Sequence, residues 1–261
     1  MIIIQNEIET VIQTIIDKFK DPFIDKTLID FITKGSKFIR SSLAILYLKS
    51  QGIEISEKVY KILAVTEIIH NASLLHDDVI DDAYTRRGNI VLAKKFNPKL
   101  SILAGDYLLS YAIEKLLVLK DFYIIELFKS CTTKMTEAEI LQYFLRGNLP
   151  SKSEYLQICK GKTACLFSTL LESCAYLSNL DINKANKFGT LFGIYFQIKN
   201  DLNNDSADLD KKNGIYTAND VLGIEKTCNL LDNYKEEMRL IIKDFPFNEY
   251  KKVLEDLIVS I

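Results

Sequence analysis

The sequence predicts an all-α protein, and three observations lead to this fold class. Only 10 Gly and 4 Pro occur among 261 residues, well under the roughly 12% of average proteins, so few tight turns can form and an all-β sandwich or barrel is disfavoured. Apolar residues recur at helical spacing in most windows, and no stretch shows the convincing alternation of a strand. The prolines are isolated and no Ser/Gly-rich linker occurs, so we predict a single domain over residues 1–261.

Each predicted helix follows from the apolar spacing and from residues that start or stop helices. Ser56, Ser101 and Ser153 are expected to begin three helices, while Gly52 and Gly147 end two. Most of these helices run for about four to six turns, long enough to bury a sizeable core. In chain order, we predict helices over residues 2–19, 38–49, 59–80, 102–119, 121–145, 154–177, 182–203, 218–242 and 247–259.

Composition excludes several classes of function. Lys and Arg number 33 against 35 Asp and Glu, a net charge of -2, so there is no overall basic field and nucleic acid is not an expected partner. Five cysteines without a CxxC pair favour reduced, mostly buried thiols in a cytoplasmic protein. No apolar run reaches about 18 residues without a charge, so no membrane span is expected. The first residues also lack the basic flank of a signal peptide.

Residues 70–88 carry the most informative pattern in the chain. Asp77, Asp78 and Asp81 lie at positions i, i+1 and i+4, followed by Asp82, at the end of a strongly apolar helix. Carboxylates at i and i+4 are neighbours on a helix, and like charges about 4 Å apart repel by about 4 kcal/mol at an effective dielectric constant of about 20. Mg2+ would offset this repulsion, because it takes hard oxygen ligands and keeps waters that phosphate oxygens can replace.

Cationic residues accompany this acidic cluster. Arg86 and Arg87 follow it directly, and their fork-shaped donors suit diphosphate. His70 lies two helical turns before Asp77, on the same helix face, which makes it a candidate for the same pocket. Acids for a metal and arginines for phosphate indicate a site for magnesium diphosphate. The alternative is a solvated acidic helix end with basic neighbours, and a lone histidine such as His70 is more typical of a core.

This segment resembles the trans-prenyltransferase (polyprenyl diphosphate synthase) family of isoprenoid synthases. The family signature places D-D-x-x-D after an H-x-A-S-L-x-H run and before R-R-G, and all of it is present here. Further motifs follow in the family's order over about residues 35–225. The resemblance implies an all-α bundle of about ten or more helices around a central cavity.

Four shorter motifs support the resemblance. The segment 35–41 resembles G-G-K-R-x-R-P and keeps Lys37 and Arg40, although Ser36, Phe38 and Ser41 depart from it. Residues 103–108 resemble the family's A-G-D-Y-L helix start, Gln142 matches the glutamine of G-E-x-x-Q, and 162–167 match K-T-A-x-L-F.

The family's second acidic motif, F-Q-I-x-D-D-x-x-D, is altered. Asn200 and Asn204 replace two of its aspartates, and only Asp201 is kept. Asn200, Asn204 and Asp208 share the spacing i, i+4 and i+8, so one helix face could still ligate a hard cation through amide oxygens and one carboxylate. This spacing resembles the N-D-x-x-(S/T)-x-x-x-E motif of terpene cyclases. The family's nearby lysines are not recognisable, although Lys211 and Lys212 are close. The alternatives are a weakened site or a decayed one.

The resemblance implies that an allylic diphosphate is joined to isopentenyl diphosphate, with Mg2+ as cofactor and a homodimer as the usual assembly. The metal ligands implied are Asp77, Asp81, Asn200, Asp201, Asn204 and Asp208. Catalytic roles, chiefly on the allylic diphosphate, fall to Asp77, Asp78, Asp81, Arg86, Lys162 and Thr163. Substrate-binding roles fall to Lys37, Arg40, His70, Arg87, Gln197, Lys211 and Lys212.

Product length and two other functions stay open at this point. Ala72 and Ser73, just before the first motif, are small and do not block a growing apolar chain, which favours a longer product. Tyr107 or Tyr111 could instead block the chain and limit its length. The altered second motif also suits a terpene cyclase, or a non-catalytic subunit of a heteromeric prenyl synthase. The retained basic residues of the isopentenyl site argue against a cyclase, and the intact first motif argues against a non-catalytic subunit.

Overall fold

The computed structural model describes residues 2–16, 22–203 and 207–260, with their side chains except those of 22–26, 207–208 and 260. Helices dominate this part of the chain, so the prediction of an all-α fold is confirmed. Its one sheet is a small antiparallel hairpin of β1 (Thr85–Arg86) and β2 (Asn89–Ile90), too short to leave an alternation in the sequence. No helix in this part is long and apolar enough to span a membrane.

The chain groups into two compact units. The first unit comprises residues 1–45 and 55–122, and the second comprises residues 46–54 and 123–261. The helix α3 (Ile39–Lys49) contributes to both, because the boundary falls after Ile45. The single domain inferred from the sequence stays a prediction.

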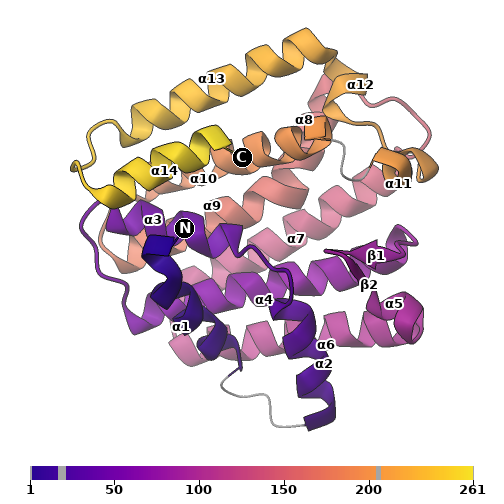
Figure 1. Cartoon of the computed structure of the whole chain (residues 1–261), viewed down its shortest axis with the longest axis horizontal. Helices are drawn as coiled ribbons and strands as arrows, with labels where there is room; N and C mark the ends of the chain where they lie inside the picture. The colour runs from indigo at the N-terminus through magenta and orange to yellow at the C-terminus, as the bar shows by residue number, and fades with distance from the viewer. Residues whose placement is uncertain (1, 17–21, 204–206, 261) are drawn as a thin grey trace. The chain divides into compact units, whose positions relative to one another are not determined.

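In the first unit, α4 and α6 lie side by side, and α1 and α2 pack against α4 (Figure 1). Ser56 caps α4 as predicted, by accepting a hydrogen bond from the Val59 amide. By contrast, α6 begins earlier than predicted, because Asn97 caps it and Pro98 occupies its first position, which leaves Ser101 buried inside the helix. The helices of this unit are η1 (Ile2–Ile4), α1 (Gln5–Ile16), α2 (Pro22–Thr33), α4 (Glu57–Ile80), α5 (Leu92–Lys95) and α6 (Pro98–Leu119).

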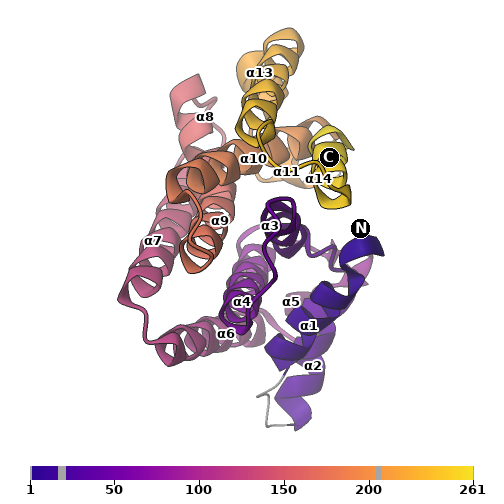
Figure 2. The same ribbon diagram turned by 90° about the vertical axis from the view of Figure 1, so that its left-hand side faces the viewer.

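In the second unit, α10 packs against both α9 and α13 (Figure 2). Two glycines of α10 permit its close approach to residues 164–168: a Cβ added at Gly193 would lie 2.4 Å from the Ala164 Cα, and one added at Gly189 would lie 2.7 Å from the Ser168 Cα. The helices are α7 (Phe122–Phe144), α8 (Lys152–Ile158), the π-helix η2 (Cys159–Ala164), α9 (Cys165–Leu177), α10 (Ile182–Asn203), α11 (Ala207–Lys212), α12 (Ala218–Leu222), α13 (Ile224–Ile242) and α14 (Glu249–Ser260).

Several details differ from the prediction, each for a local reason. Ser151 rather than Ser153 caps α8, because Ser151 forms a capping box with Glu154. The π-helix interrupts the helix predicted over 154–177, and Gly223, with a φ of 78°, divides the one predicted over 218–242. The helices α2, α5 and α11 were not predicted. All five cysteines are free thiols, as expected.

Candidate active site

The first acidic motif lies at the C-terminal end of α4. Asp81 is the C-cap residue, and its amide donates to the Asp77 carbonyl at 2.8 Å. Asp78 differs from its neighbours, because its carboxylate is fully buried and accepts a hydrogen bond of 2.6 Å from the Arg86 Nε. Burial raises the pKa of Asp78, and the Arg86 charge opposes that rise. Asp78 therefore ties the helix end to the β1–β2 hairpin, while Asp77 and Asp81 lie at positions that are partly open to solvent.

The turn of the hairpin presents Arg87 to the loop before α3. Arg87 has a φ of 52° and Gly88 a φ of 75°, conformations that a tight hairpin turn requires. The Arg87 guanidinium donates a hydrogen bond to the Ser36 hydroxyl. Gly35 lies against the same side chain, since an added Cβ would come within 3.2 Å of the Arg87 Cβ. This loop also carries the exposed Lys37, so its basic end lies next to the hairpin.

His70 lies among three arginines of the same unit. The burial of its ring, followed by the charges of Arg40, Arg87 and Arg86, holds the pKa of His70 well below its ordinary value. A bound anion would stabilise this arrangement, because it would offset the repulsion among the arginines beside the neutral histidine. The structure therefore brings together four of the residues that the sequence suggested for diphosphate binding.

Glu67 is a neighbour of this cluster that the sequence analysis missed. It is buried on α4, one turn before His70, and accepts hydrogen bonds from the Ser41 hydroxyl (2.6 Å) and amide (3.1 Å). Burial and the Arg86 charge lower the pKa of Arg87, and the Glu67 carboxylate acts in the opposite direction. A glutamate inside an otherwise apolar helix was the available signal. Ser41 supplies an amide donor where the family motif has proline.

The His76 side chain of α4 packs against the A-G-D segment of α6. A Cβ added at Gly105 would lie 2.3 Å from the His76 Nε2, so only glycine leaves room for this ring. The same nitrogen lies 3.3 Å from an Asp106 carboxylate oxygen. This contact holds α6 against the residue that immediately precedes the first acidic motif.

In the second unit, the π-helix presents Lys162. Its ammonium lies 2.7 Å from the Gln142 side-chain oxygen and 2.5 Å from a Glu139 carboxylate oxygen, both on α7. Gly161 allows the approach of α7, because an added Cβ would lie 2.5 Å from the Ala138 Cβ. π-Helical turns are frequent at functional sites, and this one turns Lys162 and Thr163 out of α-helical register.

Hydrogen bonds link Thr163 to the remaining aspartate of the second motif. The Thr163 hydroxyl donates to the Gln197 side-chain oxygen at 2.7 Å, and the Gln197 amide nitrogen donates to Asp201 at 2.8 Å. The other Asp201 oxygen accepts from the Tyr155 hydroxyl at 2.6 Å and from the Ala218 amide at 3.0 Å. Burial raises the pKa of Asp201, and these hydrogen bonds oppose the rise. Tyr155 was missed because nothing local marks it.

The other described residues expected at the second motif lie on α10 and α11. Asn200 is exposed near the end of α10, while Lys211 and Lys212 are exposed at the end of α11. Asn204 lies outside the described residues, and Asp208 belongs to α11 but its side chain lies outside them.

The first motif has the chemistry of a magnesium site. Among the described residues, no group of three or more His, Cys, Asp or Glu side chains is arranged to hold a metal ion. Mg2+ is usually bound by one or two carboxylates, with waters and substrate phosphates completing its shell. The pair Asp77 and Asp81, beside arginines that suit a diphosphate, fits that mode of binding.

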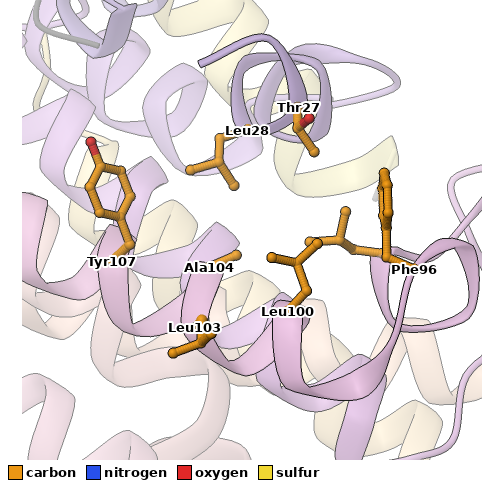
Figure 3. A pocket seen from close by; sticks show the side chains of 8 residues that line it. Thr27, Leu28, Phe96, Leu100, Leu103, Ala104 and Tyr107 are labelled. Atoms are coloured by element: carbon orange, nitrogen blue, oxygen red, sulfur yellow. The ribbon is translucent and has the colours of Figure 1, made fainter. Parts of the chain in front are cut away.

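An apolar cavity of about 260 Å³ lies in the same unit, between α2, α5 and α6. Figure 3 shows Leu28 of α2 facing Leu100 and Ala104 of α6 across it. Tyr107 lines this cavity, whereas the Tyr111 hydroxyl donates to a backbone carbonyl of α1. The cavity suits an apolar chain. Its lining residues are Thr27, Leu28, Leu92, Phe96, Leu100, Leu103, Ala104 and Tyr107.

Comparison with known proteins settles the family. The family described as polyprenyl synthetase matches residues 21–245. The chain belongs to this family. The match covers all the motifs from which the resemblance was inferred, and it confirms that inference.

Individual relatives of this polyprenyl synthetase chain agree with the assignment. A decaprenyl-diphosphate synthase of Dictyostelium discoideum is 36% identical over 175 residues, which are 66% of this chain and 38% of that relative. The chain spans 38% of the length of this relative and 59% of that of a prenyl transferase of Cyanidium caldarium, which is 31% identical over 191 residues, or 71% of this chain.

Two solved structures share the all-α fold of this polyprenyl synthetase chain. A heptaprenyl diphosphate synthase of Staphylococcus aureus has a TM-score of 0.89 at 24% identity, covering 98% of this chain and 97% of that one. A Helicobacter pylori geranyltransferase complexed with magnesium and isoprenyl diphosphate has a TM-score of 0.77 at 22% identity, covering 98% and 94%.

Proposed function

We propose that this chain is a magnesium-dependent trans-prenyltransferase that joins an allylic diphosphate to isopentenyl diphosphate and so elongates a polyprenyl diphosphate. The observation that carries the proposal is the cluster of Arg40, Arg86 and Arg87 around a neutral His70, in the same unit as the acidic end of α4. A cluster of cations attracts a diphosphate, and two carboxylates one helical turn apart suit a magnesium ion. Membership of the polyprenyl synthetase family supports both requirements.

Residues of the first unit divide between two diphosphates in this proposal. Asp77 and Asp81 hold magnesium, which when bound neutralises the charge that develops on the leaving diphosphate. Arg86, anchored by Asp78, stabilises the same charge. Lys37, Arg40, His70 and Arg87 hold isopentenyl diphosphate at the distance that the reaction requires.

Residues of the second unit carry further groups that suit a prenyl diphosphate. Glu139 and Gln142 hold Lys162, whose positive charge can stabilise a diphosphate. Thr163 and Gln197 line the region where the allylic cation forms, and the apolar surroundings exclude water that would quench it. The leaving pyrophosphate accepts the proton, so no side-chain base is required. That the Asn200 and Asp77 faces bind one diphosphate, with Lys211 or Lys212 assisting, stays a prediction.

We also propose that the protein is a cytoplasmic homodimer. Large apolar side chains of α6 are exposed, Ile113 by 57%, Leu117 by 58% and Val118 by 53%. An apolar patch of this kind commonly marks an interface between proteins. Sedimentation of the purified chain should give twice the monomer mass.

A direct assay tests the function. The purified chain is incubated with Mg2+, labelled isopentenyl diphosphate and geranyl, farnesyl or geranylgeranyl diphosphate, and product length is read by chromatography. We expect labelled polyprenyl diphosphate in the presence of Mg2+ and none with the Asp77→Ala/Asp81→Ala double variant. Absence of elongation with all three primers would overturn the proposal.

The same assay separates the two other candidate functions. A terpene cyclase would release hydrocarbon from an allylic diphosphate alone, without isopentenyl diphosphate. A non-catalytic subunit would be inactive by itself and would change the rate or product of an active prenyl synthase added to it. Elongation by the isolated chain excludes the second candidate.

A further inference from the structure

We propose that Tyr155 is a positioning residue for prenyl transfer, and that Asp201 serves as its anchor point rather than as a metal ligand. This inference rests on the function proposed above and deepens it. A line of hydrogen bonds runs from Tyr155 through Asp201 and Gln197 to Thr163, entirely inside the second unit.

The contacts of Asp201 leave little room for a metal. One carboxylate oxygen accepts from Gln197, and the other accepts from both Tyr155 and the Ala218 amide. A carboxylate has about four lone-pair positions, so three are already in use. A metal ion would have to displace donors that also hold α8 and the first turn of α12 against α10.

Tyr155 is suited to fix this arrangement. Its side chain is only 4% exposed, and its hydroxyl has a single proton to donate. It lies in the first turn of α8, next to the capping box of Ser151 and Glu154, so its backbone is held in place. A buried hydroxyl with one acceptor directs that acceptor strongly.

The line of hydrogen bonds has only one possible direction. Asp201, when ionised, can only accept, so the Gln197 amide nitrogen must face it and the amide oxygen must face Thr163. The Thr163 hydroxyl gives its only proton to that oxygen. Its free lone pairs therefore suit a positive charge, such as that of the allylic cation, and its hydroxyl cannot also donate to a diphosphate oxygen.

This role explains why the altered motif still needs a carboxylate at position 201. Asparagine would place an NH2 group where Asp201 now accepts from a donor, and two donors would then face each other. Positions 200 and 204, by contrast, are asparagine here.

The chain offers a matched control for Tyr155. The Tyr123 hydroxyl donates to the Glu172 carboxylate at the same distance, 2.6 Å, in the same unit, but it has no link to Gln197. We expect Tyr155→Phe to lower kcat about tenfold, with KM for both diphosphates and the Mg2+ half-saturation unchanged. Tyr123→Phe should leave all these constants unchanged. Equal kinetics of the two variants would overturn the positioning role.

The variant Asp201→Asn distinguishes the role of Asp201 as a hydrogen-bond anchor from a role as a metal ligand. We expect a fall in kcat at least as large as that of Tyr155→Phe, again without a shift in Mg2+ half-saturation. If Asp201 were a metal ligand, Asp201→Asn would instead raise the Mg2+ concentration needed for half-maximal activity about tenfold or more. That second result would overturn the proposal.

A measurement without turnover keeps this inference separate from the proposed function. In protein labelled with 15N-glutamine, the side-chain amide signal assigned to Gln197 by its loss in Gln197→Glu should exchange slowly with solvent. Tyr155→Phe should shift it and speed its exchange, and Tyr123→Phe should not. An unchanged signal in Tyr155→Phe overturns the inference, whereas the expected signals from a chain that shows no elongation would overturn only the proposed function.

Discussion

The two acidic motifs use their second aspartate in the same way. Asp78 of the first motif is buried against Arg86, and Asp201 of the second is held by Tyr155 and two further donors. Both carboxylates join separate elements of their unit. An aspartate-rich motif therefore mixes carboxylates that can meet a ligand with carboxylates that hold the backbone in place.

The outer positions of the motifs differ instead. The first motif keeps Asp77 and Asp81, whereas the second has Asn200 and Asn204. An amide oxygen can still ligate a cation but brings no negative charge. Compared with the family motif, the chain thus lacks carboxylates at positions 200 and 204, where a metal would bind, and keeps the Asp201 carboxylate, which holds elements of the fold together.

The largest expected effect comes from the outer positions of the first motif. Asp77→Ala or Asp81→Ala should lower kcat for prenyl transfer by about a thousandfold, because charge on the leaving diphosphate loses its counter-ion. Steady-state assays at saturating Mg2+ measure this. The control is Asp82→Ala, next in the chain, whose exposed side chain pairs with Lys94. Wild-type kinetics in both motif variants would remove the basis for the comparison.

The second position of the first motif should affect stability more than metal binding. Asp78→Ala removes a fully buried carboxylate from the Arg86 pair, and we expect the free energy of unfolding to fall by about 3 kcal/mol. Urea denaturation measures this, and Asp82→Ala should cost less than about 1 kcal/mol because that ion pair is exposed. An Asp78→Ala protein of normal stability with weakened Mg2+ activation would place Asp78 among the ligands.

The sequence predicted those parts of the molecule that local patterns determine. The apolar period and the Ser56 cap located α4, and the period alone located α10 with the bounds observed. The spacing of His70 from Asp77 predicted one helix for both residues, and both lie on α4. The family motifs then supplied Arg40, which the structure places near His70.

The rest depends on contacts that leave no local trace. Tyr155 and Asp201 are 46 residues apart, and no periodicity connects them. The π-helix around Lys162 has no sequence period of its own, because one inserted turn only shifts an α-helical pattern. The family resemblance implied a catalytic role for Asp78, and only tertiary packing shows that it faces Arg86.

Restoring acid in the second motif should have a moderate effect. Asn200→Asp adds a carboxylate to an exposed position of α10, and we expect the Mg2+ half-saturation of prenyl transfer to fall by about three- to tenfold. Asn183→Asp adds the same charge to an exposed position at the other end of the same helix, and is the matched control. An equal response to both would indicate a general charge effect and not a ligand at position 200.

The smallest expected effect concerns the charge around His70. Its pKa is lowered in the folded protein from an ordinary value of 6.5, so the unfolded chain binds the proton more readily and stability falls as the pH drops below that value. Between about pH 7.5 and 5.5, His70→Gln should lose about 1 kcal/mol less stability than the wild type in urea denaturation. His76→Gln, at the chain's other histidine, is the control. Inorganic diphosphate should shrink the difference, because an anion among Arg40, Arg86 and Arg87 makes a protonated His70 easier to accommodate. Parallel stability profiles with and without the anion would mean that this cluster does not bind diphosphate, and would leave the second unit as the main anion site.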